Sequence, residues 1–165
     1  MTNYNVETML EDMAKQLQTR FESQGIKDPM MIGIHTGGAW IASRLYDMLG
    51  IKKPLGTLNI SFYRDDFTRI GVHPQVAPSK ISGSTENQHI ILVDDVLYTG
   101  RTIRAAINEI FDYGRPASIT LVALVERDGR ELPIQADVVG VHMDLTNDQQ
   151  VKLTGPEPLA LTKTD

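Results

Sequence analysis

Apolar positions along the chain follow two alternating patterns. Over residues 6–21 they recur every three or four positions after Asn5, which predicts an amphipathic helix with a polar cap. Short, nearly continuous apolar runs predict strands at residues 30–34, 57–63, 90–93 and 118–125. Helical segments separate them at residues 36–50 and 101–113. Because strands and helices alternate, the fold class is α/β, with a central, mostly parallel sheet flanked by helices.

Two parts of the chain depart from this alternation. Residues 64–88 are rich in Pro, Gly, Ser and Thr and show no sustained period, so we predict an active-site lid. After Glu126 only short apolar pieces follow, at 138–141 and 150–153. No repeat or linker divides the chain, and we expect residues 1–165 to form one domain.

Composition narrows the class of protein. A chain of 165 residues with 41% hydrophobic and 22% charged residues is typical of a soluble globular domain. No apolar run is long enough to span a membrane and the first residues do not resemble a signal peptide, so we expect a cytoplasmic protein. The absence of cysteine excludes disulfides, thiolate nucleophiles and cysteine-bound zinc. A net charge of −5 argues mildly against nucleic-acid binding, although a local basic patch would still permit it.

Residues 90–102 carry the most informative chemistry. They read Ile-Ile-Leu-Val-Asp-Asp-Val-Leu-Tyr-Thr-Gly-Arg-Thr, an apolar run, two carboxylates and a small loop before a helix. Ligands of parallel sheets bind beyond the carboxyl ends of the strands, and a helix N-terminus offers unpaired N–H groups to a phosphate. The hydroxyls of Thr99 and Thr102 add two donors. This segment therefore predicts a site for a phosphorylated sugar.

The carboxylates of Asp94 and Asp95 need a different ligand, since they would repel a phosphate placed against them. Carboxylates accept hydrogen bonds only, and a ribose diol supplies two donors. A magnesium ion could share the site, because it prefers carboxylate and phosphate oxygens. Taken without its context, the acidic pair would equally suit a solvated strand end or a helix cap.

Residues 90–102 resemble the phosphoribosyl pyrophosphate (PRPP) motif of type I phosphoribosyltransferases and lack the second glycine and the lysine of a Walker loop. Segments 33–38, 63–66, 114–116 and 130–134 extend the resemblance to one branch, the pyrimidine operon regulators with uracil phosphoribosyltransferase activity. It implies the type I phosphoribosyltransferase fold, with a small hood formed by residues 127–165 and the N-terminal region. It also implies that PRPP and uracil give UMP and pyrophosphate with Mg²⁺, in a homodimer or higher oligomer.

The resemblance also implies a role for individual residues. The residues expected to hold the 5-phosphate are Val96, Leu97, Tyr98, Thr99, Gly100, Arg101 and Thr102, and those expected to hold pyrophosphate are Thr36, Gly37 and Gly38. Asp94 and Asp95 would hold the ribose hydroxyls and, directly or through water, the metal. Arg64 would reach pyrophosphate from the lid, and Arg127 and Val151 would contact the base. Displacement at the anomeric carbon needs no protein nucleophile, only stabilisation of the leaving group.

Several of these roles have a plain alternative. Thr36-Gly37 would also suit an ordinary turn into a helix, and the family's basic residue beside this Thr is missing, since two glycines follow it. Arg64, next to two acids, would also suit a surface ion pair. Arg127 and Arg130 would equally suit a structural role.

The residue type at position 98 indicates which class of nucleobase to expect. Purine members of the family carry an Asp at this position and a Lys where Glu126-Arg127 stands here. A carboxylate is thus missing where purine chemistry would use one, which favours a pyrimidine, and we expect uracil.

The charge pattern bears on regulation through RNA. RNA-binding members carry basic residues on the first helix and at positions matching Gly129, Gln135 and Val141, none of which is basic here. Residues 136–165 hold two Lys against five acids. We therefore expect an enzyme whose binding to leader RNA is weak or lost. The alternative is a UMP-sensing, RNA-binding regulator with vestigial catalysis.

Overall fold

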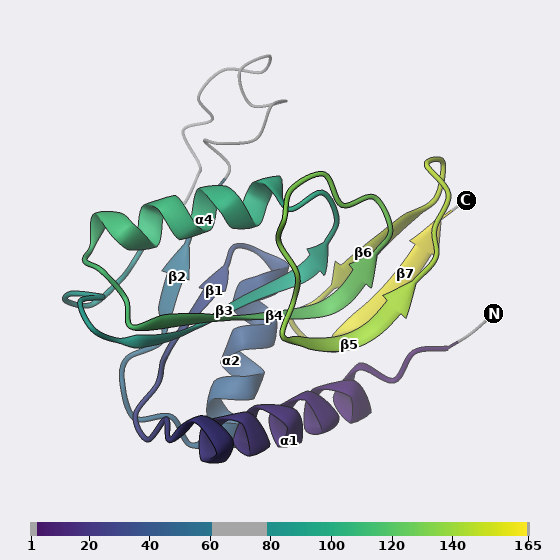
Figure 1. Cartoon of the computed structure of the whole chain (residues 1–165). Coiled ribbons are helices and arrows are strands. Elements are labelled where there is room, and N and C mark those ends of the chain that lie inside the picture. The colour runs from purple at the N-terminus through teal and green to yellow at the C-terminus, as the bar shows by residue number, and fades with distance from the viewer. Residues whose placement is uncertain (1–2, 61–78, 165) are drawn as a thin grey trace.

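A five-stranded parallel sheet forms the centre of the molecule (Figure 1). The structure, a computed structural model, describes residues 3–60 and 79–164. Its strands are β1 (Met30–Ile34), β2 (Gly56–Leu58), β3 (His89–Leu97), β4 (Ser118–Arg127) and β5 (Val138–Met143), in the order β2-β1-β3-β4-β5. All neighbouring pairs run parallel. The predicted α/β architecture is therefore confirmed.

Helices cover both faces of this sheet. Helices α1 (Val6–Gln24) and α2 (Gly37–Leu49) lie on one face and α4 (Arg101–Asp112) on the other (Figure 1). The side chain of Asn5 caps α1, as predicted, by accepting a hydrogen bond from the backbone N–H of Thr8 at 3.1 Å. Each face has its own apolar cluster, one with α1 and α2 and one with α4.

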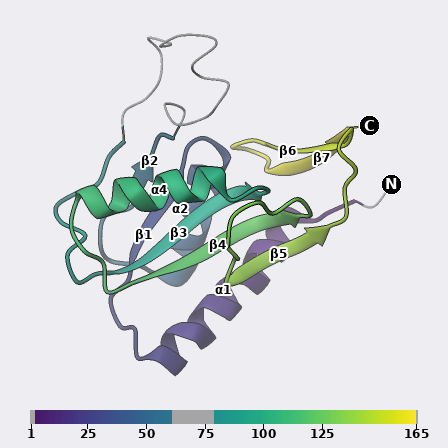
Figure 2. The same cartoon turned by 45° about the horizontal axis from the view of Figure 1, so that its top comes forward.

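A two-stranded antiparallel sheet stands beside the main one. Strands β6 (Gln150–Thr154) and β7 (Ala160–Thr164) form a hairpin near the carboxyl ends of β3 and β4 (Figure 2). Within the residues expected to form the hood, 127–165, β5 pairs with β4 as the fifth strand of the main sheet. The N-terminal helix α1 also packs on the main sheet, against α2 and β5. The hairpin of β6 and β7 forms a sheet of its own.

The ends of two strands differ from the sequence expectation. Strand β3 continues past the predicted end at Val93 to Leu97, because β4 runs beside it and Val96 and Leu97 pair with Val125 and Glu126. The acidic pair breaks the apolar run but not the backbone ladder. Strand β2 is shorter than predicted and ends at Leu58, since β1 offers partners only as far as Ile34.

The predicted lid falls largely outside the described residues, and so does Arg64. Residues 79–88, the last part of the predicted lid, are bonded to the rest of the domain. Lys80 and Thr57 exchange two backbone hydrogen bonds of 2.8 Å, and the hydroxyl of the fully buried Thr85 donates to the carbonyl of Ile110. Across the described ranges, no helix combines the length and the apolar character that crossing a membrane requires.

Candidate phosphoribosyl site

Asp94 and Asp95 lie near the carboxyl end of β3, the middle strand of the main sheet. One carboxylate oxygen of Asp94 accepts the backbone N–H of Asp95, and one of Asp95 accepts that of Val96, both at 2.9 Å. Asp94 is buried, with 6% of its surface exposed, whereas Asp95 is half-buried. These bonds fix the direction of both side chains before any ligand arrives.

Two glycines at the start of α2 bring a second loop against the acidic pair. A β-carbon at Gly37 would lie 2.2 Å from Oδ2 of Asp95, and one at Gly38 would lie 2.6 Å from the carbonyl oxygen of Val93. Real β-carbons do not approach other atoms so closely, so any side chain here would push the loop away. The loop expected to hold pyrophosphate and the pair expected to hold ribose therefore lie in contact.

The loop after β3 ends at the N-terminus of α4. Gly100 is the cap residue, with φ of +93°, a backbone conformation that favours glycine. The hydroxyl oxygen of Thr99 accepts the backbone N–H of Arg101 at 3.2 Å. A hollow of about 110 Å³ opens here, lined by Asp94, Val96, Leu97, Tyr98, Thr99, Gly100, Thr102 and Ile103. The structure thus brings most of the predicted 5-phosphate residues around one small hollow.

Tyr98 lies against Arg127 and Gly129. The guanidinium carbon of Arg127 lies 4.1 Å from the centre of its ring, a cation–π contact. Gly129 leaves room for the ring, since a β-carbon there would lie 2.3 Å from Cε2 of Tyr98. Arg127 also donates to the carbonyl oxygens of Gln149 at 3.2 Å and Thr146 at 3.3 Å. It therefore ties Tyr98 to the segment that precedes β6.

Val96 and Val151 lie on the same side of the sheet. Both are half-buried and pack against the apolar cluster formed with α1 and α2, and β3 contacts β6. Val151 therefore packs on the same apolar cluster as Val96, and Arg127 binds the carbonyl oxygen of Gln149, two residues before Val151.

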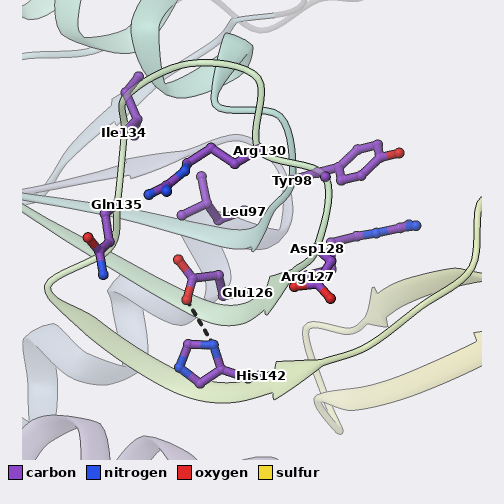
Figure 3. Close-up of a pocket in the computed structure, with 10 residues that line it drawn as sticks. Leu97, Tyr98, Glu126, Arg127, Asp128, Arg130, Ile134, Gln135 and His142 are labelled. Atoms are coloured by element: carbon purple, nitrogen blue, oxygen red, sulfur yellow. Dashed lines mark ion pairs between the residues drawn. The ribbon is translucent and has the colours of Figure 1, made fainter.

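A larger pocket of about 260 Å³ is lined by residues at the ends of β3 and β4, by His142 of β5 and by parts of the segment 128–135. Figure 3 shows Glu126, His142 and Gln135 around it; Tyr98 and Arg127 also line it, and their side chains extend away from Glu126. Glu126 and His142 form an ion pair of 2.8 Å. The apolar floor of this pocket, Leu97 and Ile134, belongs to the cluster with α4.

Two contributors to the site carry no signal in the sequence. At Gly129 the sequence shows only that a basic residue is missing, but the missing side chain makes room for Tyr98. Glu131 binds Arg101 at the start of α4. The motif at residues 130–134 marked the branch of the family, but no periodicity could show which loop it touches.

Comparison with known proteins gives the family. Residues 3–159 match the model of the phosphoribosyl transferase domain. The bifunctional protein PyrR of Nitrosococcus oceani is 64% identical over 157 residues, which cover 94% of this chain and 89% of the relative. The bifunctional protein PyrR of Pseudomonas aeruginosa is 55% identical over 159 residues, which cover 96% of this chain and 94% of the relative.

Solved structures agree on the fold. The hypoxanthine phosphoribosyltransferase of Trypanosoma cruzi, in complex with IMP, superposes with a TM-score of 0.65 at 21% identity, covering 88% of this chain and 78% of that one. A purine phosphoribosyltransferase from Pyrococcus horikoshii gives 0.62 at 23% identity, covering 84% and 82%. The chain therefore belongs to the phosphoribosyltransferase family, on the branch of the bifunctional PyrR proteins that its motifs predicted.

Proposed function

We propose that this protein transfers the phosphoribosyl group of PRPP to uracil, forming UMP and pyrophosphate. One observation carries the proposal: the acidic pair, the Gly37-Gly38 loop and the N-terminus of α4 meet at one edge of the sheet. A phosphorylated sugar with a pyrophosphate group on its anomeric carbon needs these three kinds of partner together.

The 5-phosphate binds at the start of α4. The first N–H groups of a helix have no acceptor within the helix and lie at the positive end of its dipole. The Thr99 hydroxyl oxygen already accepts the N–H of Arg101, so its own hydrogen points elsewhere and can be donated to the phosphate. Thr102, on the first turn of α4, adds a second hydroxyl at the same hollow.

Asp94 and Asp95 accept hydrogen bonds from the ribose hydroxyls. Their negative charge also lies close to the ring, where positive charge develops as the bond from the anomeric carbon to pyrophosphate breaks. The contact with Gly37 keeps Asp95 within reach of both the ribose and the departing group. The backbone of Thr36, Gly37 and Gly38 offers N–H donors to pyrophosphate, and Arg64 remains our candidate for adding a positive charge from the lid.

The acidic pair fits a magnesium ion held jointly with the substrate. In the described part of the chain, no three His, Cys, Asp or Glu side chains gather in a way that could hold a metal. Magnesium commonly binds one or two carboxylates together with substrate phosphates and water, so two carboxylates suffice. When bound, the ion would neutralise charge on the leaving pyrophosphate. Asp94 and Asp95 would hold it directly or through water or ribose oxygens.

Uracil lies between Val96 and the hairpin in our proposal, beside Val151 and the Tyr98–Arg127 pair. The neighbours of known structure act on purines by name, so the fold by itself leaves the base open. Tyr98 supports a pyrimidine, because it supplies no carboxylate for the imidazole ring of a purine. Steady-state assays with uracil, hypoxanthine, guanine and orotate test this choice, and turnover of a purine without turnover of uracil would refute it.

Binding to leader RNA is weak or absent in our proposal. Arg20 on α1 is engaged by Asp137 in an ion pair of 3.1 Å, and Val141 packs against the apolar core. At Gly129 any side chain would collide with Tyr98. A gel-shift titration with pyrimidine leader RNA, with and without UMP, tests this. Submicromolar, strongly salt-dependent binding would favour a regulatory role instead.

The alternative of a regulator with vestigial catalysis is not favoured, because the phosphate loop, the acidic pair and the glycine loop are all present and in contact. The oligomeric state, a homodimer or more, stays a prediction for sedimentation analysis.

A further inference from the structure

Residues 130–134, which we call the brace, lie directly against the 5-phosphate loop. The backbone N–H groups of Glu131 and Leu132 both donate to the carbonyl oxygen of Thr99, at 3.0 and 3.2 Å. The carboxylate of Glu131 accepts from Nε of Arg101 at 2.8 Å. The brace therefore holds the residues on both sides of Gly100.

Apolar contacts complete this attachment. A β-carbon at Gly100 would lie 3.4 Å from the β-carbons of Leu132 and Ile134, so these two side chains cover the glycine. Ile134 also packs on the apolar cluster that contains Ile103 of α4. The brace thus joins the helix and the loop that precedes it.

The chain is anchored again three residues after the brace, at Asp137. Asp137 and Leu121 of β4 are joined by two hydrogen bonds of 2.8 Å, one through the Asp137 carboxylate and one through its backbone N–H. The other carboxylate oxygen of Asp137 binds Arg20 of α1. Because this segment is bonded to β4 and to α1, it can restrict the motion of the brace and of the 5-phosphate loop that the brace contacts.

The 5-phosphate loop, residues 96–102, has little to fix its own conformation and depends on contacts with other segments. Its cap residue is a glycine in the left-handed region, and no side chain of that residue caps α4. Glycine adopts many backbone conformations in a free loop, so the N–H groups would point in varied directions before phosphate arrives. Fixing a binding loop in its bound conformation raises affinity by lowering the entropy lost on binding.

We propose that the brace is a positioning element for the 5-phosphate loop, and that Glu131 is a positioning residue that acts through Arg101 and Thr99. This inference rests on the proposed phosphoribosyl transfer. It assigns a role to a motif that otherwise only marks the branch of the family.

The negative charge of Glu131 allows one substitution to distinguish a positioning role from a purely electrostatic effect. Its carboxylate is a negative charge next to a site for an anion, so charge alone predicts that removing it tightens phosphate binding. Positioning predicts the opposite sign. Asp128 provides the matched control, because it is an exposed acid two residues before the brace, lines the pocket beneath it and carries the same charge.

The experiment measures binding of PRPP, ribose 5-phosphate and pyrophosphate by calorimetry in magnesium buffer. We expect Glu131→Ala to weaken PRPP and ribose 5-phosphate binding about three- to fivefold, the range of an exposed ion pair. Glu131→Gln, which keeps an acceptor for Arg101, should recover part of this loss. Glu131→Ala with Leu132→Ala should reach about tenfold, by adding the loss of an apolar contact. Pyrophosphate binding and the thermal midpoint should stay unchanged in Glu131→Ala.

Asp128→Ala should bind all three ligands as well as the wild type, or slightly better. Equal behaviour of Glu131→Ala and Asp128→Ala would overturn the proposal, as would an equal loss for pyrophosphate, which does not use this loop. Calorimetry with ribose 5-phosphate does not involve the base. Failure of uracil turnover in the wild type would therefore refute the proposed substrate and leave this test intact.

Discussion

Gly37 and Asp95 lie so close that a β-carbon on the glycine would stand 2.2 Å from the carboxylate oxygen Oδ2. This relationship joins a loop at the start of α2 to the end of β3, although 58 positions separate them in the sequence, from 37 to 95. It is the closest approach that any glycine of the described residues would make with a side chain added.

The contact predicts that Gly37→Ala inactivates the enzyme. The new methyl group must displace either Asp95 or the glycine loop, and a misplacement of about 1 Å can cost on the order of 100-fold in rate. Steady-state kcat/KM with PRPP and uracil measures the loss. Gly25→Ala is the control, since it strains a helix end with φ of +66° but meets nothing within 4 Å. It should lower the thermal midpoint and keep kcat/KM.

Asp94→Asn and Asp95→Asn should each abolish detectable PRPP binding without unfolding the chain. An asparagine keeps one oxygen that can accept the N–H of the next residue, so the local turn survives while the charge is lost. Calorimetry checks PRPP binding, and circular dichroism with thermal unfolding checks the fold. Unchanged affinity in either folded variant would show that the ribose role is wrong.

Chelation of magnesium should stop turnover, and added Mg²⁺ should restore it. Without PRPP we expect weak Mg²⁺ binding, with Kd near millimolar or above, because the described side chains supply two carboxylates rather than a complete cage. Titration of Mg²⁺ with and without PRPP measures the difference. Full activity in excess chelator would contradict the metal's role.

Gly129→Ala should raise KM for uracil about tenfold and weaken PRPP binding less, since Tyr98 borders the proposed base site and is one of several residues that line the 5-phosphate hollow. The added β-carbon would lie 2.3 Å from the Tyr98 ring, which also carries the Arg127 guanidinium on its face. Gly83→Ala serves for comparison, because it also places an alanine at positive φ, here +81°, but in open space. If both variants change KM for uracil alike, backbone strain rather than the position of Tyr98 is responsible.

Much of the fold could be read from the sequence. The run Met30–Ile34 is buried at every position, and its strand has the predicted bounds. The helix from Val6 also begins as predicted and ends three residues later, at Gln24, where Gly25 in the left-handed conformation stops it. These signals are local, because burial and capping act on neighbours in the chain.

Pairing between distant segments could not be read in the same way. The extension of β3 through Val96 and Leu97 depends on its pairing with β4. The place of β5 in the main sheet depends on its pairing with the other edge of β4. Neither pairing can be recognised from the hydrophobic pattern of the strand itself, since any extended backbone can form hydrogen bonds with a parallel neighbour.

The amino-acid sequence was enough to identify the family and the chemistry, because residues 90–102 combine the acids, hydroxyls and glycine that a phosphorylated ribose requires. The partners that touch these residues became known from the folded domain: Gly37 against Asp95, Gly129 against Tyr98, and Glu131 against Arg101. The reason is physical. The type of a residue limits the bonds that it can form. The distances between segments far apart in the chain depend on how the whole domain packs.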